Sequence, residues 1–104
     1  MMETLHTEDL AQIVRTGKFV IEFYGNGCLN CQMMAPLLSN LEQILPDIHF
    51  YRINADDYPA LVRKYQLNSL PSLLLFRNGK MLSTIVGIKQ LLTLQKLIET
   101  KLNA

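Results

Sequence analysis

The chain of 104 residues suits one folded domain over residues 1–104 and is too short for two domains of ordinary size. Ten basic side chains nearly balance nine acidic ones, with no run of five or more of one sign, which argues against a nucleic-acid partner, because phosphate binding needs clustered Lys and Arg. No apolar run approaches the roughly 20 residues of a membrane helix, so we expect no membrane contact. The N-terminus lacks the basic start and apolar core of a secretory signal, which favours a cytoplasmic protein.

The first predicted elements are a helix and a strand that follow each other closely. Thr7 can cap a helix whose apolar stripe covers residues 10–14, and Gly17 can end that helix in the left-handed conformation. Residues 19–24 are apolar at nearly every position rather than at alternate ones. This pattern is typical of a strand covered on both faces, so we predict a central strand here.

A second helix and a second strand are predicted next. Apolar residues keep helical spacing across residues 33–45, where Pro36 removes one backbone hydrogen bond and should bend the helix. Residues 49–54 are aromatic and β-branched and lie before a turn-like cluster at residues 56–59, which predicts a strand. Residues 60–65 then form a short helix.

The last third of the chain predicts a hairpin and a closing helix. Asn78-Gly79 joins the strand-like residues 72–77 and 80–86, and this dipeptide is the strongest short-range signal for two antiparallel strands. Residues 89–102 place Leu91, Leu94, Ile98 and Leu102 on one face of a helix. The whole order predicts an α/β domain with a mixed sheet covered by helices on both faces.

The only two cysteines, Cys28 and Cys31, lie between the predicted strand of residues 19–24 and the helix of residues 33–45. A helix N-terminus offers unpaired N–H groups and the positive end of a dipole, which favour a thiolate over a thiol. A pair this close stabilises little as a permanent crosslink, by about 2 kcal/mol, so the pattern favours a dithiol redox site. Two alternatives stay open, namely an inert buried pair and a zinc site that also uses His6 and His49.

Further landmarks accompany the cysteines at compatible spacing. They are Glu22 in the apolar strand, Met33-Met34-Ala35-Pro36 on the next helix, Ser69-Leu70-Pro71-Ser72 before a strand, Asn78-Gly79, and Val86-Gly87 before the last helix. With these features the chain resembles the thioredoxin family over almost its full length. The resemblance implies the thioredoxin fold, a central mixed β-sheet flanked by helices on both faces. It also implies thiol–disulfide exchange with no metal and no cofactor other than the redox-active Cys28–Cys31 disulfide.

The resemblance assigns roles to the central residues. Cys28, nearest the helix N-terminus, attacks a substrate disulfide, and Cys31, one turn further, resolves the mixed disulfide. Glu22 interrupts the apolar strand, and burial there would raise its pKa, so that it takes the proton of Cys31 through water. A carboxylate at a strand edge facing solvent is the alternative for Glu22. Arg52 either pairs with Glu22 or is simply exposed.

A substrate groove is also implied by the resemblance. The Leu70–Pro71 peptide bond is expected to be cis, which leaves the Leu70 backbone free to pair with an extended substrate segment. An ordinary trans proline at the start of a strand is the alternative. Gly27, Leu70, Gly87 and Ile88 would line this shallow apolar groove.

Three positions around the cysteines depart from the family. Gly27 replaces the usual tryptophan, Leu29-Asn30 replaces Gly-Pro, and Gln32 replaces a basic residue. We predict a monomeric, cytoplasmic thiol–disulfide oxidoreductase that reduces protein disulfides and is recycled by a reductant such as a thioredoxin reductase. A thioredoxin-fold binding module with little redox turnover is the second hypothesis, which the replaced residues favour. An oxidant or isomerase is a third, which the cytoplasmic prediction argues against.

Overall fold

The computed structural model describes residues 2–103, so the two end residues of the predicted domain lie outside the described part. In chain order the elements are β1 (Glu3–Thr4), α1 (Leu10–Ile13), β2 (Lys18–Tyr24), α2 (Leu29–Ile44), β3 (Ile48–Asn54), the 3₁₀ helix η1 (Ala55–Asp57), α3 (Pro59–Lys64), β4 (Ser72–Arg77), β5 (Lys80–Val86) and α4 (Leu91–Leu102). No helix within residues 2–103 is both long and apolar enough to cross a membrane.

Strand β2 lies at the centre of a five-stranded sheet with the order β1-β3-β2-β4-β5. It pairs in parallel with β3 and antiparallel with β4, while β1 is parallel to β3 and β5 is antiparallel to β4. The predicted central strand and the mixed sheet are therefore confirmed. The hairpin of β4 and β5 has the predicted bounds, because Asn-Gly turns favour the twist that joins two antiparallel strands.

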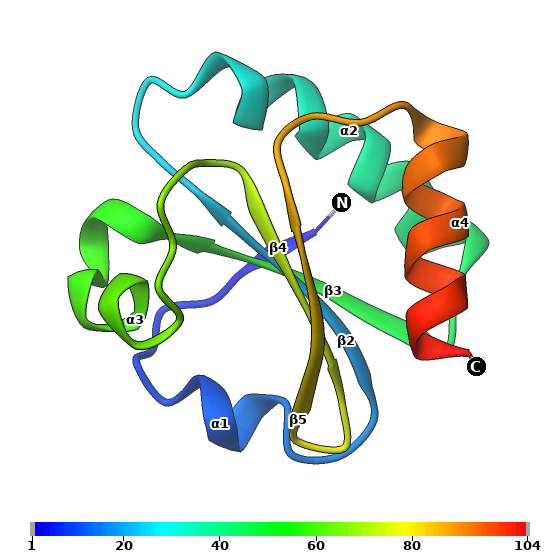
Figure 1. Ribbon diagram of the computed structural model, residues 1–104, viewed down its shortest axis with the longest axis horizontal. Helices are drawn as coiled ribbons and strands as arrows, with labels where there is room; N and C mark the ends of the chain where they lie inside the picture. Colours follow the sequence, from blue (N-terminus) through cyan, green and yellow to red (C-terminus); the bar gives the residue numbers. More distant parts are fainter. Residues whose placement is uncertain (1, 104) are drawn as a thin grey trace.

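Helices cover both faces of this sheet, as predicted. Figure 1 shows α2 and α4 on one side and α1 and α3 on the other. Alternate side chains of β2 supply the two cores: Val20 packs with the α2 and α4 residues, whereas Ile21 and Phe23 pack with those of α1 and α3. A strand that contributes to a core on each face needs apolar residues throughout, and this explains the continuous run at residues 19–24.

The predicted cap of the first helix is wrong. Asp9, not Thr7, is the N-cap of α1, and its Oδ1 accepts a hydrogen bond from the Gln12 N–H at 3.3 Å. Thr7 instead accepts from the N–H of Asp9 at 3.0 Å, which fixes the loop before the helix. Gly17 does have a left-handed φ of +107°, but it lies beyond the helix end and exchanges hydrogen bonds with Asn78 of the hairpin turn.

Other boundaries differ from the prediction by a few residues. Helix α2 begins at Leu29, four residues earlier than predicted, and continues through Pro36 to Ile44. The turn predicted at residues 56–59 holds η1, which Asn54 caps, followed by α3 with Pro59 in its first turn. Strand β1 was not predicted, since two residues carry no periodicity.

Candidate active site

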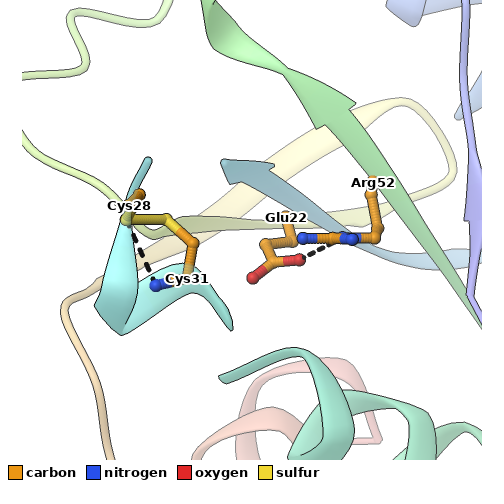
Figure 2. Close-up of polar contacts among 4 residues, drawn as sticks. All are labelled: Glu22, Cys28, Cys31 and Arg52. Atoms are coloured by element: carbon orange, nitrogen blue, oxygen red, sulfur yellow. Dashed lines mark hydrogen bonds and ion pairs between the residues drawn. A yellow bond between two sulfur atoms is a disulfide. The ribbon is translucent and has the colours of Figure 1, made fainter. Parts of the chain in front are cut away.

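The two cysteines lie at the end of β2, where the chain turns into α2. Cys28 is the N-cap of α2, and its Sγ accepts a hydrogen bond from the Cys31 N–H at 3.2 Å. The two sulfur atoms are joined in a disulfide, and the two Cα atoms lie 5.3 Å apart (Figure 2). This separation is ordinary for a disulfide, so the three-residue spacing on a helix turn suits closing and opening of the bond.

The two sulfurs differ in their access to solvent. Cys31 is 1% exposed and belongs to the buried face of α2, whereas Cys28 is only half-buried. Gly27, just before Cys28, is exposed and has a φ of +69°, a conformation that side chains rarely adopt. A partner can therefore reach Cys28 from solvent, and it can reach Cys31 only if the surrounding residues move to uncover its sulfur.

Glu22 lies beneath the disulfide on β2 and is fully buried, which contradicts the alternative of a solvent-facing carboxylate. Its Oε1 accepts a hydrogen bond from Arg52 Nε at 2.8 Å, while Oε2 has no partner among the described residues. Figure 2 shows this carboxylate between the disulfide and Arg52. Burial raises the pKa of Glu22 above its ordinary value, and the hydrogen bond and charge of Arg52 offset only part of that effect.

Arg52 is held from a second side by an aromatic ring. Its guanidinium carbon lies 4.0 Å from the centroid of the Tyr24 ring, in cation–π geometry. Arg52 lies beside Glu22 because the two residues are register partners in the parallel pairing of β3 with β2. Its side chain is 23% exposed and lines a cavity of about 520 Å³ beside Pro36. Arg52 thus joins the buried carboxylate to a hollow at the surface.

Two loops meet next to the cysteine loop. The Leu70–Pro71 peptide bond is cis, and the Pro71 carbonyl accepts a hydrogen bond from the Gly87 N–H at 2.9 Å. A Cβ on Gly25 would lie 2.8 Å from Leu70 Cδ1, so Leu70 packs directly on the backbone that leads to Cys28. The residues predicted for substrate contact therefore come from segments that these contacts link, namely Gly27, Leu70, Pro71, Gly87 and Ile88.

The comparisons with known proteins agree with this arrangement. The family model named Thioredoxin matches residues 1–100. The chain belongs to the thioredoxin family. Among its relatives, thioredoxin of Chlamydia caviae is 33% identical over 98 residues, covering 94% of this chain and 96% of the relative. Thioredoxin-1 of Saccharomyces cerevisiae is 34% identical over 68 residues, covering 65% of this chain and 66% of the relative.

Solved structures of thioredoxins share the fold. The crystal structure of mitochondrial thioredoxin 3 of Saccharomyces cerevisiae in its oxidized form matches with a TM-score of 0.86 and 27% identity, covering 95% of this chain and 94% of that one. The thioredoxin fold predicted from the sequence is confirmed. Thioredoxin membership and a cysteine pair within disulfide distance together support thiol–disulfide oxidoreductase activity.

The zinc-site alternative requires His6 and His49 to lie beside the two cysteines. Within residues 2–103, no group of three or more His, Cys, Asp or Glu side chains is placed to hold a metal ion. The His49 ring stacks on Phe19 with centroids 5.0 Å apart. Phe19 belongs to the core between the sheet and helices α1 and α3, on the opposite face from Cys31.

Two residues that shape the loop before Cys28, Gly25 and Asp56, were not identified from the sequence. Asp56 Oδ2 accepts a hydrogen bond from the Asn26 N–H at 2.7 Å, and Asn54 donates to the Asn26 side chain at 3.0 Å. Gly25 leaves space for Leu70. Asp56 was visible only as part of a turn-like cluster, and the Gly25 contact joins positions 45 residues apart, so local pattern carried no signal for either contact.

Proposed function

We propose that this thioredoxin reduces protein disulfides, with Cys28 as the nucleophile and Cys31 as the resolving thiol. The observation that carries the proposal is the difference in exposure: a half-buried sulfur at the N-cap of α2 is bonded to a sulfur that is 1% exposed. Only Cys28 can meet a substrate disulfide, and only Cys31 is close enough to displace that substrate afterwards. Backbone N–H groups at the start of a helix favour the Cys28 thiolate.

The exchange proceeds in two displacements. The Cys28 thiolate attacks one sulfur of the substrate disulfide, forming a mixed disulfide and releasing the second substrate sulfur as a thiolate, which takes up a proton. Cys31 then loses its proton and attacks Cys28 Sγ, which forms the internal disulfide and releases the first substrate sulfur as a thiol. In total the protein dithiol loses two electrons and two protons, and the substrate disulfide gains them.

Glu22 accepts the proton of Cys31 during the second displacement. Support comes from its full burial and from its Oε2, which lacks a partner among the described residues. Because its pKa is raised, this carboxyl is better matched to proton exchange near neutral pH than an ordinary glutamate. One water between Glu22 and Cys31 carries the transfer, and water in the cavity that Arg52 lines returns the proton to solvent.

Gly27, Leu70, Pro71 and Gly87 form the contact surface for the substrate chain. An extended segment beside Cys28 can add to the free backbone of Leu70, as a strand adds to a sheet edge. We further propose that the protein acts as a monomer in the cytoplasm and that a reductant such as a thioredoxin reductase returns Cys28 and Cys31 to the dithiol form. A reducing compartment fits this direction of exchange.

The test uses two cysteine variants with insulin as the disulfide substrate and dithiothreitol as the recycling reductant. Wild type should accelerate insulin reduction, and Cys28→Ser should not exceed the rate of dithiothreitol alone. Pre-reduced Cys31→Ser, mixed with insulin in the absence of dithiothreitol, should instead accumulate a mixed disulfide with insulin, visible on a non-reducing gel, because no second thiol displaces it. A mixed disulfide that forms through Cys31 in Cys28→Ser would reverse the assigned roles, and equal rates for wild type and Cys28→Ser would contradict the reductase.

A binding module with little turnover is the second candidate, favoured by Leu29 and Asn30 between the cysteines and by Gly27 before them. Titration of the Cys28/Cys31 pair in redox buffers separates the two functions. A reversible two-electron couple near or below about −250 mV supports a reductant, and one near −200 to −120 mV an oxidant or isomerase. A pair that cannot be cycled supports the binding module.

A further inference from the structure

Two large apolar side chains stand exposed beside the reactive cysteine. Leu29, the residue after Cys28, is 72% exposed, and Met33, one helical turn later, is 60% exposed. Residues four apart lie next to each other on a helix surface, so Leu29 and Met33 form one apolar ridge on the solvent side of α2. The opposite side of the same turns carries Cys31 and Met34, which are buried.

The segments around Cys28 also contain no charged residues of their own. Charged residues make up 18% of the chain, yet none occurs in residues 25–33, 69–72 or 85–88, the segments that surround the cysteine. Two charged groups border these segments: the exposed Asp56, whose Oδ2 accepts from the Asn26 N–H, and Lys89, whose Nζ donates to the Val86 carbonyl at 2.8 Å. A partner that docks on Leu29 and Met33 therefore meets an apolar ridge, and charge lies only at the border of the wider surface.

We propose that the ridge of Leu29 and Met33 selects protein disulfides that are flanked by apolar, uncharged residues. The inference rests on the proposed reductase function and names its substrate class. Attack by Cys28 brings the substrate sulfur to bonding distance, about 2.05 Å, so the residues next to the substrate cysteine must lie against the residue next to Cys28. Apolar flanks gain free energy from burial on the ridge, whereas charged flanks lose water there, and Leu29 and Met33 offer them no opposite charge.

The test compares two cyclic peptide disulfides of equal length and zero net charge. One carries Leu and Val beside each cysteine, and the other carries Glu and Lys at those positions. Each is mixed with pre-reduced protein, the reaction is quenched with acid and alkylated, and the rate constant is divided by that of the same peptide with dithiothreitol. The readout is the preference, the ratio of the two normalised rates, in which changes of intrinsic thiol reactivity cancel.

We expect wild type to prefer the apolar peptide by about tenfold, the effect of burying roughly one aliphatic side chain. Leu29→Asn and Met33→Gln keep side-chain size but remove apolar surface, and each should lower the preference at least about threefold. Ile44→Asn is the matched control, because Ile44 is also exposed on α2 but lies fifteen residues from Leu29, about 22 Å along the helix. Its preference should equal that of wild type.

The possible outcomes distinguish a failure of the ridge proposal from a failure of the proposed reductase function. The ridge proposal is overturned if wild type reduces both peptides with a preference near one, or if the preference is unchanged in both ridge variants. Either result leaves the proposed reductase function intact. Failure of folded, pre-reduced wild type to reduce either peptide overturns the proposed reductase and the ridge with it. A preference that Ile44→Asn lowers as much as Met33→Gln also overturns the assignment, because the effect would then not be local to Cys28.

Discussion

Replacing Glu22 by Gln should change how the stability of the oxidised protein depends on pH. Glu22→Gln keeps the side-chain shape and an oxygen that can accept from Arg52, but it has no proton equilibrium. In the folded protein the carboxyl is fully buried and its pKa is raised above the ordinary value of 4.5. In the unfolded chain it returns to that ordinary value. The variant therefore removes one group that titrates differently in the two states.

The sign and size of the effect follow from proton linkage. Between pH 4.5 and the raised folded pKa, the folded state holds a proton that the unfolded state has lost. The free energy of unfolding of wild type therefore falls as pH rises through this interval, by at most about 1.4 kcal/mol per pH unit for one group, and the effect is constant above it. The favourable contribution of protonated Glu22 is complete below pH 4.5 and is lost on ionisation.

Urea unfolding from pH 4.5 to 8.5, with the disulfide intact, measures this effect. The free energy of Glu22→Gln minus that of wild type should increase toward high pH, since all other carboxyl groups contribute equally to both proteins. Parallel curves for wild type and Glu22→Gln would refute the raised pKa.

Two further predictions concern side chains that support the site. Gly25→Ala should force Leu70 out of its rotamer and lower the free energy of unfolding in urea by about 1 kcal/mol. The same change in a Leu70→Ala background should cost less, and an equal cost in both backgrounds would contradict the contact between Gly25 and Leu70. Tyr24→Leu should lower the free energy of unfolding by about 1 kcal/mol, because the cation–π contact with Arg52 is lost. Tyr24→Phe keeps the ring and should lower that free energy little. Equal decreases for the two variants would refute the contact.

The uncharged ridge of Leu29 and Met33 connects the departures from the family to a function. In place of the Gly-Pro that the resemblance implied between the cysteines, this chain presents an exposed leucine at the start of α2. An altered sequence between the cysteines can therefore affect the choice of substrate as well as the redox potential, and the peptide comparison and the redox titration measure these two effects separately.

Local patterns in the sequence determined most of the framework. The unbroken apolar run before the cysteines predicted a central strand, because only a strand buried on both faces lacks alternation, and β2 is that strand. Asn78-Gly79 predicted the hairpin with correct bounds, since turn geometry depends on the turn residues themselves. The spacing of Cys28 and Cys31 predicted a redox pair at a helix start, because three residues span one turn.

Tertiary structure decided what those residues meet. The burial of Glu22 and its pairing with Arg52 depend on the register of β2 against β3, which no local pattern specifies. The contact of Leu70 with Gly25 and the hydrogen bond from Asn26 to Asp56 join positions that are close only after the chain has folded. Secondary structure follows from interactions between near neighbours, whereas the burial of Glu22 and the geometry of the loop before Cys28 arise from packing between distant segments.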